Sequence, residues 1–376
     1  MLHRVGTRIV DAQGNPVQLR GVNLGGWLLW EGWMFGGGFD GETYLRRQLR
    51  LLAGTNEAQA FVRAFHTNFI AGADLRRIAQ MGFNTVRVPF NYRLLAGEPT
   101  GSAGPSESWA LLDQLLDWCE QYRLYAVLDL HSAPGGQSVW WVADPGDNPV
   151  SLWKSPEHQR ETVALWREVA AHFKNRAALA GYDLLNEPDP PPGPGLTELY
   201  VQIIHAIREE DPRHLIFLEG GTLGIDLPKF TAPPDENAAY SFHIYTWVGD
   251  DRKEKLAGYE VLAKSQNVPL WVGEFGENTR EIIGSTVEMF NQHQEICGWA
   301  FWPWKSAPGR FPGLYTITIP GDWQKMMTWI RSPLFHPEPT PDEISNGMKA
   351  FLEAVKLERT EFDAETAKAL GGRLDH

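Results

Sequence analysis

Short runs rich in β-branched and aromatic residues alternate along the chain with longer amphipathic stretches. Eight runs have the length and composition of buried strands. One lies near Val22, and the others span 83–90, 124–131, 179–187, 215–220, 239–245, 269–275 and 297–302. Apolar residues recur every three or four positions, as in helices, over 73–82, 109–122, 158–174, 196–210 and 285–295. This alternation predicts parallel strands joined by helical crossovers, and eight such units predict a closed (β/α)8 barrel of the α/β class.

The two ends of the chain and its longest connections fit around such a barrel. Turn residues between Asp11 and Pro16 separate two short alternating runs, which predicts an N-terminal hairpin within residues 1–18. Residues 341–376 predict one or two outer helices. Long segments follow the first, third, fourth and eighth strands, on the carboxyl side where barrel enzymes build their sites; they span 28–67, 132–154, 189–195 and 305–323. We expect residues 1–376 to form a single catalytic domain.

Composition narrows the classes of partner. The formal net charge of -13 disfavours nucleic acid and anionic membrane surfaces. Cys119 and Cys297 have no histidine at ligand spacing, and no His-x-His pair or glycine-rich nucleotide turn accompanies the strands, so neither a metal nor another cofactor is expected. The first eleven residues lack the apolar core of a secretory signal, which predicts a cytoplasmic location, or secretion if a leader has been removed.

Two carboxylic acids fall at predicted strand ends. Glu187 closes the fourth strand between Asn186 and Pro188, and proline disfavours helical geometry in the residue before it, so we expect Glu187 to be extended. Glu274 closes the seventh strand. Splitting an acetal bond requires one carboxyl group that gives a proton to the leaving oxygen and another that meets the developing positive charge at the sugar carbon. The pair is therefore a candidate for acid/base and nucleophilic chemistry.

Other polar and aromatic residues at strand ends are expected to converge with this pair on a volume that would hold one sugar ring. They are Arg87, His131, Asn186, His243, Tyr245 and Trp302. Asp129 lies two residues before His131, on the same face of its strand, and is expected to hold that imidazole in a structural role. Glu219 follows the fifth strand, where contact with the sugar and an ion pair at the rim both stay open. Glu277 is expected to be solvated.

The motifs RGVNLGGW, VRVPFNY, DLHSAPGGQ, YDLLNEP, HIY, WVGEFG and GWAFWPWK occur in this order. Together they resemble glycoside hydrolase family 5, from about Leu19 to Trp304. The resemblance implies a retaining (β/α)8 enzyme in which Glu187 is the acid/base, Glu274 is the nucleophile and Asn186 donates to the 2-hydroxyl of the sugar.

The same resemblance implies roles for the supporting residues. Arg87 and Tyr245 resemble the groups that orient and ionise the nucleophile. His131 and His243 resemble the histidines that line the sugar-binding position, and Trp302 resembles its aromatic floor.

Within the family, GGWLLWE together with HSAPGGQ and FWPWK resembles the exo-β-1,3-glucanase and β-glucosidase branch, which implies that Glu31 holds the terminal sugar. Aromatic rings stack on the flat faces of sugars, so four loop tryptophans are expected at the mouth as platforms: Trp140, Trp141, Trp247 and Trp304. The expected substrate is a β-linked oligosaccharide or glycoside, namely a β-glucoside or short β-1,3-glucan cleaved from its end. An endo-β-1,4-glucanase, a β-mannosidase and a sugar-binding barrel without activity remain alternatives.

Overall fold

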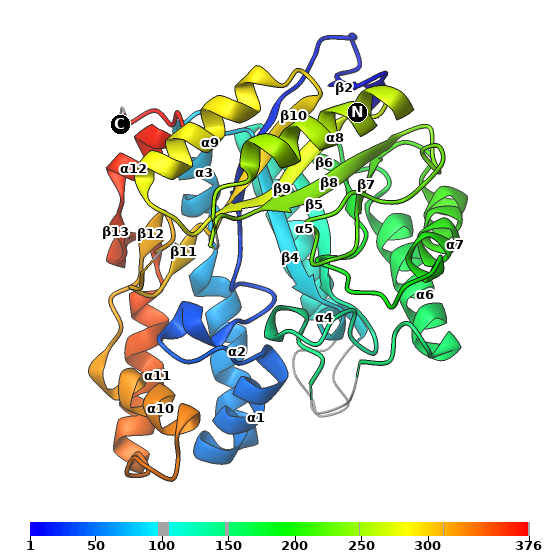
Figure 1. Ribbon diagram of the computed structural model, residues 1–376. Helices are drawn as coiled ribbons and strands as arrows, with labels where there is room; N and C mark the ends of the chain where they lie inside the picture. The colour runs from blue at the N-terminus through cyan, green and yellow to red at the C-terminus, as the bar shows by residue number, and fades with distance from the viewer. Residues whose placement is uncertain (97–104, 147–149, 248, 311, 375–376) are drawn as a thin grey trace.

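In the computed structural model, the described residues are 1–96, 105–146, 150–247, 249–310 and 312–374. Eight parallel strands close into a barrel in the order β10-β3-β4-β5-β6-β7-β8-β9 (Figure 1). Their bounds are β3 Leu19–Asn23, β4 Thr85–Asn91, β5 Tyr125–Ser132, β6 Leu179–Asp183, β7 Leu215–Glu219, β8 Ala238–Ile244, β9 Leu270–Gly276 and β10 Ile296–Trp302. All eight predicted strands are confirmed. The strands are buried on both faces, as their nearly continuous apolar sequences require.

Helices cover the outside of the barrel and return the chain to the start of six of the strands, whereas residues 220–237 join β7 to β8 without a helix. They include α3 Gly72–Gln80, α5 Pro105–Tyr122, α6 Pro156–Phe173, α7 Gly195–Glu210, α8 Arg252–Gln266 and α9 Arg280–Gln292. Local sequence fixes where several begin. The hydroxyl of Ser155 accepts the backbone N–H of His158, and Pro156 occupies the first turn of α6. Thr279 caps α9 in the same way. The five predicted helical stretches coincide with α3, α5, α6, α7 and α9, so these predictions are confirmed.

The long connections carry elements of their own. The first contains η1 Gly32–Phe35, α1 Glu42–Ala53 and α2 Thr55–Phe69, and short elements α4 Tyr92–Ala96 and η2 Trp141–Ala143 follow β4 and β5. The segment after β10 holds β11 Lys305–Ser306, β12 Tyr315–Thr316 and α10 Gly321–Arg331; the C-terminal segment adds α11 Pro341–Ala354, η3 Leu357–Arg359, β13 Glu361–Phe362 and α12 Ala364–Ala369. Helix α11 packs on α10 and α2, and β13 pairs with β12, so the C-terminal segment lies against the first insertion (Figure 1).

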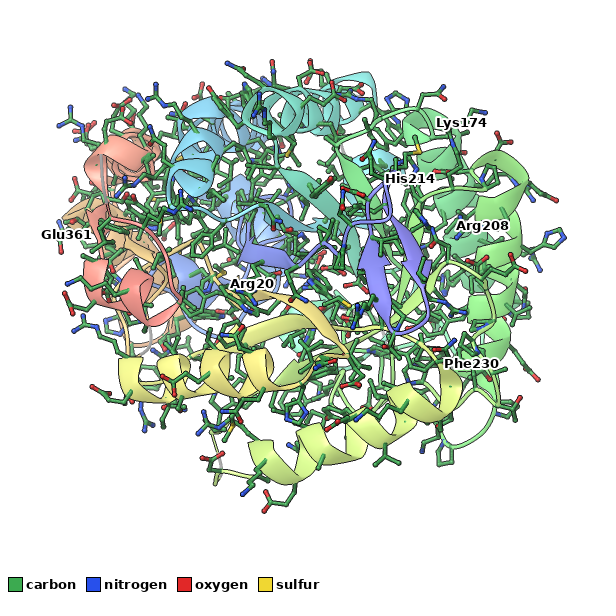
Figure 2. All side chains as sticks on the ribbon, turned by 90° about the horizontal axis from the view of Figure 1, so that it is seen from above. Arg20, Lys174, Arg208, His214, Phe230 and Glu361 are labelled. Carbon is green, nitrogen blue, oxygen red and sulfur yellow. The ribbon has the colours of Figure 1, made fainter. Side chains whose placement is uncertain are left out.

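The N-terminal hairpin closes the amino end of the barrel. Its strands are β1 His3–Val5 and β2 Arg8–Val10, which pair around Gly6 at a φ of 61°. The hairpin turn therefore lies nearer the N-terminus than the turn at Asp11–Pro16 that the sequence predicts. The predicted turn at Asp11–Pro16 also forms, through a bridge between Val10 and Pro16. Leu2 and Ile9 pack against apolar residues at the strand starts, and Figure 2 shows the hairpin lying across this end, between Arg20 and Arg208.

None of the helices within the described ranges combines the length and the apolar character that crossing a bilayer demands.

Candidate active site

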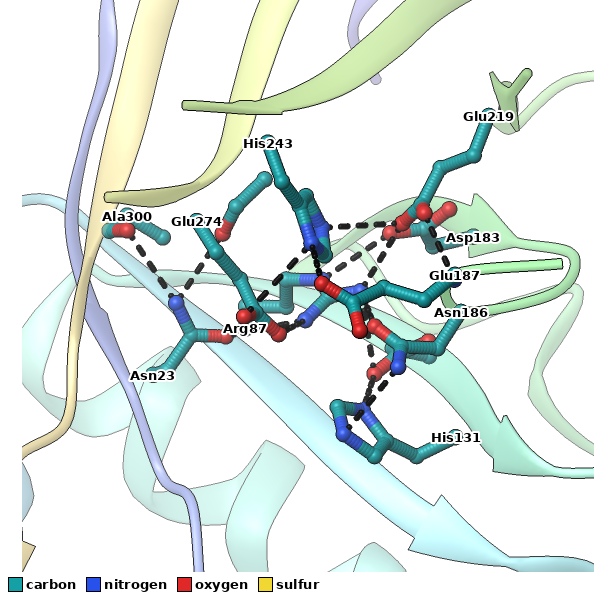
Figure 3. Close-up of polar contacts among 12 residues, drawn as sticks. Asn23, Arg87, His131, Asp183, Asn186, Glu187, Glu219, His243, Glu274 and Ala300 are labelled. Atoms are coloured by element: carbon teal, nitrogen blue, oxygen red, sulfur yellow. Dashed lines mark hydrogen bonds and ion pairs between the residues drawn. The ribbon is translucent and has the colours of Figure 1, made fainter. Parts of the chain in front are cut away.

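Arg87 stands at the centre of a buried polar cluster at the carboxyl end of the barrel (Figure 3). Its guanidinium donates from Nη1 to Oε1 of Glu274 over 2.6 Å and from Nε to Oδ2 of Asp183 over 2.9 Å. From Nη2 it reaches Oε1 of Glu219 at 3.0 Å and Oδ2 of Asp129 at 3.2 Å. Burial disfavours the cation, but these carboxyl groups outweigh it and hold the pKa of Arg87 well above its usual range. Arg87 is thus a fixed positive charge inside the barrel.

Glu274 is held on both of its oxygens. Arg87 donates to Oε1, and the hydroxyl of Tyr245 donates to Oε2 over 2.9 Å. A ring nitrogen of His243, Nδ1, lies 3.5 Å from the same Oε2. Burial alone would raise the pKa of Glu274, but the charges of His243 and Arg87 outweigh it and lower the pKa below the ordinary value. Glu274 is therefore an ionised carboxylate at neutral pH.

Glu187 faces Glu274 with His243 between them. Nδ1 of His243 lies 2.8 Å from Oε1 of Glu187, and one oxygen of each carboxyl group and one ring nitrogen lie within 4.8 Å of one another. Burial raises the pKa of Glu187 to about 7, although the hydrogen bond and charge of His243 partly offset it. The Glu187 side chain is 14% exposed, whereas that of His243 is enclosed, so Glu187 reaches toward the opening of the site. Two neighbouring carboxyl groups thus have pKa values shifted in opposite directions.

The backbone of Glu187 corrects one expectation. Strand β6 ends at Asp183, and Glu187 follows it with a φ of 44°, in the left-handed region rather than extended. Such a conformation costs a residue other than glycine about 1–3 kcal/mol and persists only where the surroundings impose it. Here Oε2 of Glu219 accepts the Glu187 N–H over 2.8 Å. Tertiary contacts therefore override the local preference that Pro188 sets.

His131 and Asn186 form one wall of the site. Nδ1 of His131 lies 2.6 Å from Oδ2 of Asp129, which confirms that Asp129 holds the imidazole. Burial lowers the pKa of His131 to about 3, so the neutral ring can accept a hydrogen bond at Nε2 from Nδ2 of Asn186, 3.2 Å away. The ring also lies parallel to Trp302, with centroids 5.6 Å apart. The amide of Asn186 is fixed further because Oδ1 accepts from Arg87.

Glu31 lies at the start of the first insertion and is 2% exposed. The indoles of Trp33 and Trp141 donate to its Oε2 over 2.8 and 3.0 Å. Its Oε1 is buried and has no hydrogen-bond partner among the described residues. Burial, with smaller contributions from Glu274 and Glu277, raises the pKa of Glu31 to about 8. Glu31 is therefore a neutral carboxyl group with a free polar atom, close enough to Glu274 to be affected by its charge.

Of the four tryptophans predicted as platforms, Trp140 and Trp247 are exposed and Trp141 is half-buried, and their role toward a sugar stays a prediction. Trp247 is 60% exposed, stacks on Tyr245 at 4.4 Å and donates from Nε1 to Oε2 of Glu277 over 3.1 Å. Trp141 packs against Trp140, whose side chain is exposed. Glu277 is not simply solvated, because burial and the nearby Glu274 raise its pKa to about 7. Sequence reasoning missed the contact of Glu277 with Trp247.

Trp304 is wrong as a predicted platform. Its ring is fully buried, packs on Tyr315 at 4.7 Å and donates from Nε1 to Oδ1 of Asp74 over 2.9 Å. Asp74 also pairs with the buried ammonium group of Lys305 at 2.6 Å. The reason is that the chain beyond β10 folds into the small sheet of β11 and β12 instead of running along the rim.

Only one group of three potential metal ligands lies close together among the residues that the structure describes: Glu187, His243 and Glu274. Arg87 already places a positive charge 2.6 Å from Glu274. Because the surrounding charges also raise the pKa of His243 well above its usual range in spite of burial, its ring carries a second positive charge. This arrangement opposes a bound cation and suits a neutral polar ligand.

Solved structures share the fold. A rutinosidase from Aspergillus niger aligns with a TM-score of 0.61 at 17% identity, covering 84% of this chain and 96% of that one. An endogalactoceramidase aligns with a TM-score of 0.60 at 21% identity, covering 81% and 75%.

The names of several curated relatives describe enzymes that act on β-linked sugars. A β-xylosidase from Phanerodontia chrysosporium is 33% identical over 77% of this chain and 64% of its own length. A probable glucan 1,3-β-glucosidase A from Aspergillus fumigatus is 31% identical over 55% of this chain and 51% of its own. The chain thus spans about half to two thirds of the length of these relatives. The family model described as cellulase (glycosyl hydrolase family 5) matches residues 10–308. The chain belongs to glycoside hydrolase family 5.

Proposed function

We propose that the protein is a retaining β-glycosidase that removes single sugars from the ends of β-glucosides or short β-1,3-glucans. The observation that carries the mechanism is the short gap between Glu187 and Glu274, of which one oxygen each lies within 4.8 Å of the other. Retaining enzymes hold their carboxyl groups about 5–5.5 Å apart, while inverting enzymes need about 6.5–9.5 Å to admit a water between them. The gap here suits direct attack by one carboxylate.

The opposite pKa shifts of the two carboxyl groups support a different role for each. Glu274 is ionised and held by Arg87 and Tyr245, so it attacks the anomeric carbon. Glu187, with a pKa of about 7, gives its proton to the glycosidic oxygen. The aglycone leaves as an alcohol, and the sugar remains bound to Glu274 as an ester. Glu187 then takes a proton from water, which attacks the anomeric carbon and releases both the sugar and Glu274.

Supporting residues hold the sugar during both steps. Asn186 is fixed between Arg87 and His131, which suits a donor to the 2-hydroxyl. Trp302, parallel to His131, supplies an aromatic floor, and Trp247 supplies an exposed ring at the opening. Trp141 contributes by orienting Glu31.

Glu31 supports action at chain ends. Its free Oε1 can bind a hydroxyl of a terminal sugar, and the first insertion that carries it would close one end of the cleft. A pocket closed in this way favours release of monosaccharides over cleavage within a chain. The endo-β-1,4-glucanase and β-mannosidase alternatives would differ in this pocket, not in the catalytic pair.

A β-xyloside is a second candidate substrate, favoured by the 33% identity with a β-xylosidase across 77% of this chain. Xylose lacks the exocyclic hydroxymethyl group of glucose, so the two substrates would differ only at the closed end of the pocket. A sugar-binding barrel without activity is disfavoured, because both carboxyl groups are present together with the residues that contact them, Arg87, Tyr245 and His243.

Two measurements test the proposal. The first follows the anomers released from an aryl β-glucoside by proton NMR: β-anomer appearing first supports retention, and α-anomer appearing first contradicts it. The second incubates the protein with aryl gluco-, xylo-, manno- and galactosides and with laminari- and cello-oligosaccharides. Release of monosaccharide alone from oligosaccharides supports the pocket, and mixed oligosaccharides contradict it.

A further inference from the structure

Glu219 is a buried carboxyl group at the end of β7, beneath the catalytic pair. Its side chain is fully enclosed, so it meets neither solvent nor substrate. Of the two alternatives left by the sequence, contact with the sugar is wrong, and the ion pair exists, with Arg87, but in the buried interior and not at the rim. The positive charges of His243 and Arg87 outweigh the effect of burial and lower the pKa of Glu219, so the group is ionised.

The contacts of Glu219 reach three parts of the site at once (Figure 3). Oε2 accepts the backbone N–H of Glu187 over 2.8 Å. Oε1 accepts from Nη2 of Arg87 over 3.0 Å and lies 3.1 Å from Nε2 of His243, outside the alignment of a good hydrogen bond. His243 in turn presents its other nitrogen, Nδ1, to Oε1 of Glu187. One carboxylate thus reaches Glu187 by two routes, through its backbone and through the imidazole.

The hydrogen bond between Glu219 and the Glu187 backbone holds a residue that has a strained conformation. Glu187 has a φ of 44°, and its N–H points to Glu219 instead of to a neighbouring strand. A left-handed conformation in a residue other than glycine needs surroundings that impose it. The hydrogen bond that the Glu187 N–H donates to Glu219 is such a constraint, and it sets the direction in which the Glu187 side chain leaves the backbone.

The other buried acids beside Arg87 differ from Glu219. Asp183 accepts from Nε of Arg87, and Asp129 holds His131. Among the described residues, Glu219 is the one carboxyl group that contacts Arg87, His243 and the backbone of Glu187 together. Asp183 is therefore a matched control, since it is equally buried and bound to the same guanidinium.

We propose that Glu219 is a positioning residue for the acid/base group: it fixes the backbone of Glu187 and the ring of His243 so that the Glu187 carboxyl group points at the glycosidic oxygen. This inference rests on the proposed function. Glu219 itself exchanges no proton with the substrate. It acts on the steps in which Glu187 gives up or takes up a proton, because these depend on the direction of the carboxyl group, and kcat/KM reports the first of them.

The test uses two leaving groups. Departure of 2,4-dinitrophenolate needs no proton, whereas departure of phenol from phenyl β-glucoside does. We expect Glu219→Gln to lower kcat/KM on phenyl β-glucoside by roughly 10- to 100-fold, a part of the 10²- to 10⁴-fold that general acid catalysis contributes, and to change kcat/KM on the dinitrophenyl substrate by less than about threefold. Glu219→Asp, which keeps the charge, should recover part of the activity on phenyl β-glucoside.

Asp183→Asn is the control for removing a buried negative charge beside Arg87. It should affect both substrates by the same factor. An equal loss on both substrates in Glu219→Gln, or no loss on either, would overturn the inference. Far-UV circular dichroism monitors folding, and if Glu219→Gln does not fold, the ratio of the two kcat/KM values in Glu219→Asp decides: an unchanged ratio overturns the inference.

Glu187→Ala separates this inference from the proposed function. It should show the same dependence on the leaving group, with added azide restoring turnover of the dinitrophenyl substrate. If Glu187→Ala lacks that dependence, the assigned acid/base role fails. If Glu187→Ala shows it and Glu219→Gln does not, only the role of Glu219 fails.

Discussion

The hydroxyl of Tyr245 donates a hydrogen bond of 2.9 Å to Oε2 of Glu274. Tyr245 comes from the loop after β8 and Glu274 from within β9, so the contact joins neighbouring strands of the barrel. A hydrogen bond to the charged form of a carboxyl group favours ionisation. The same contact also holds the second oxygen of Glu274 in place while the first is bound to Arg87.

Glu274→Ala should abolish turnover while sugar binding persists. We expect kcat on an activated aryl β-glucoside to fall roughly 10⁵-fold, the scale on which removing a catalytic nucleophile acts. Initial rates and isothermal titration with a disaccharide check the two halves of this prediction. Glu288→Ala, on the exposed face of α9, is a matched control that should retain full activity. Turnover by Glu274→Ala near the rate of the unaltered protein would refute the assignment.

The pH dependence of kcat/KM should be bell-shaped. Activity requires Glu187 protonated, and its pKa of about 7 places the loss of activity on the alkaline side near neutrality. Activity also requires Glu274 ionised, and its lowered pKa places the acid limb below the ordinary range of a glutamate. Rates measured from about pH 3 to about pH 9 test both limbs. On a dinitrophenyl substrate, whose departure needs no proton, the unaltered protein should lack the alkaline limb; an alkaline limb that persists there belongs to another group.

Trp247 and Trp304 should respond in opposite ways to substitution. Trp247→Ala removes an exposed ring at the opening and should raise KM about fivefold, equivalent to a ring contact of about 1 kcal/mol, with little change in stability. Trp304→Phe removes the donor to buried Asp74 and should lower the free energy of unfolding by about 1–3 kcal/mol with KM unchanged. Steady-state kinetics and urea unfolding distinguish the two. A raised KM in Trp304→Phe would show instead that the Trp304 ring contacts the substrate.

Because of Glu31, the free energy of unfolding should fall as the pH rises. Its pKa is about 8 in the folded protein against an ordinary value of 4.5, so between these values the folded state binds more protons than the unfolded state. Replacing it by Gln removes this proton linkage. The Tm of Glu31→Gln relative to the unaltered protein should therefore rise between about pH 5 and about pH 8. A constant difference across that range would show that Glu31 is charged in the folded protein.

The barrel could be predicted from sequence because its signals are local. Each strand is a short apolar run, and polar residues stand near the strand ends, so the sequence alone places Arg87 and Glu274 at one end of a barrel. The motif resemblance added the family, which the family model confirms.

What the sequence could not predict depends on contacts between distant segments. Pro188 favours an extended Glu187, but the hydrogen bond to Glu219 from another strand decides its conformation. Trp304 looks like a loop residue, yet Asp74, 230 positions away, draws it into the core. The sequence places Glu219 at the end of a strand, but it cannot show the contacts of its carboxyl group with Arg87, His243 and the backbone of Glu187.

The N-terminal hairpin seals the barrel at the end away from the catalytic pair. A tether attached at β1 or β2 would therefore leave the mouth facing away from any solid support. Immobilising the protein through this hairpin should therefore keep the end of the barrel that carries Glu187 and Glu274 open to molecules in solution.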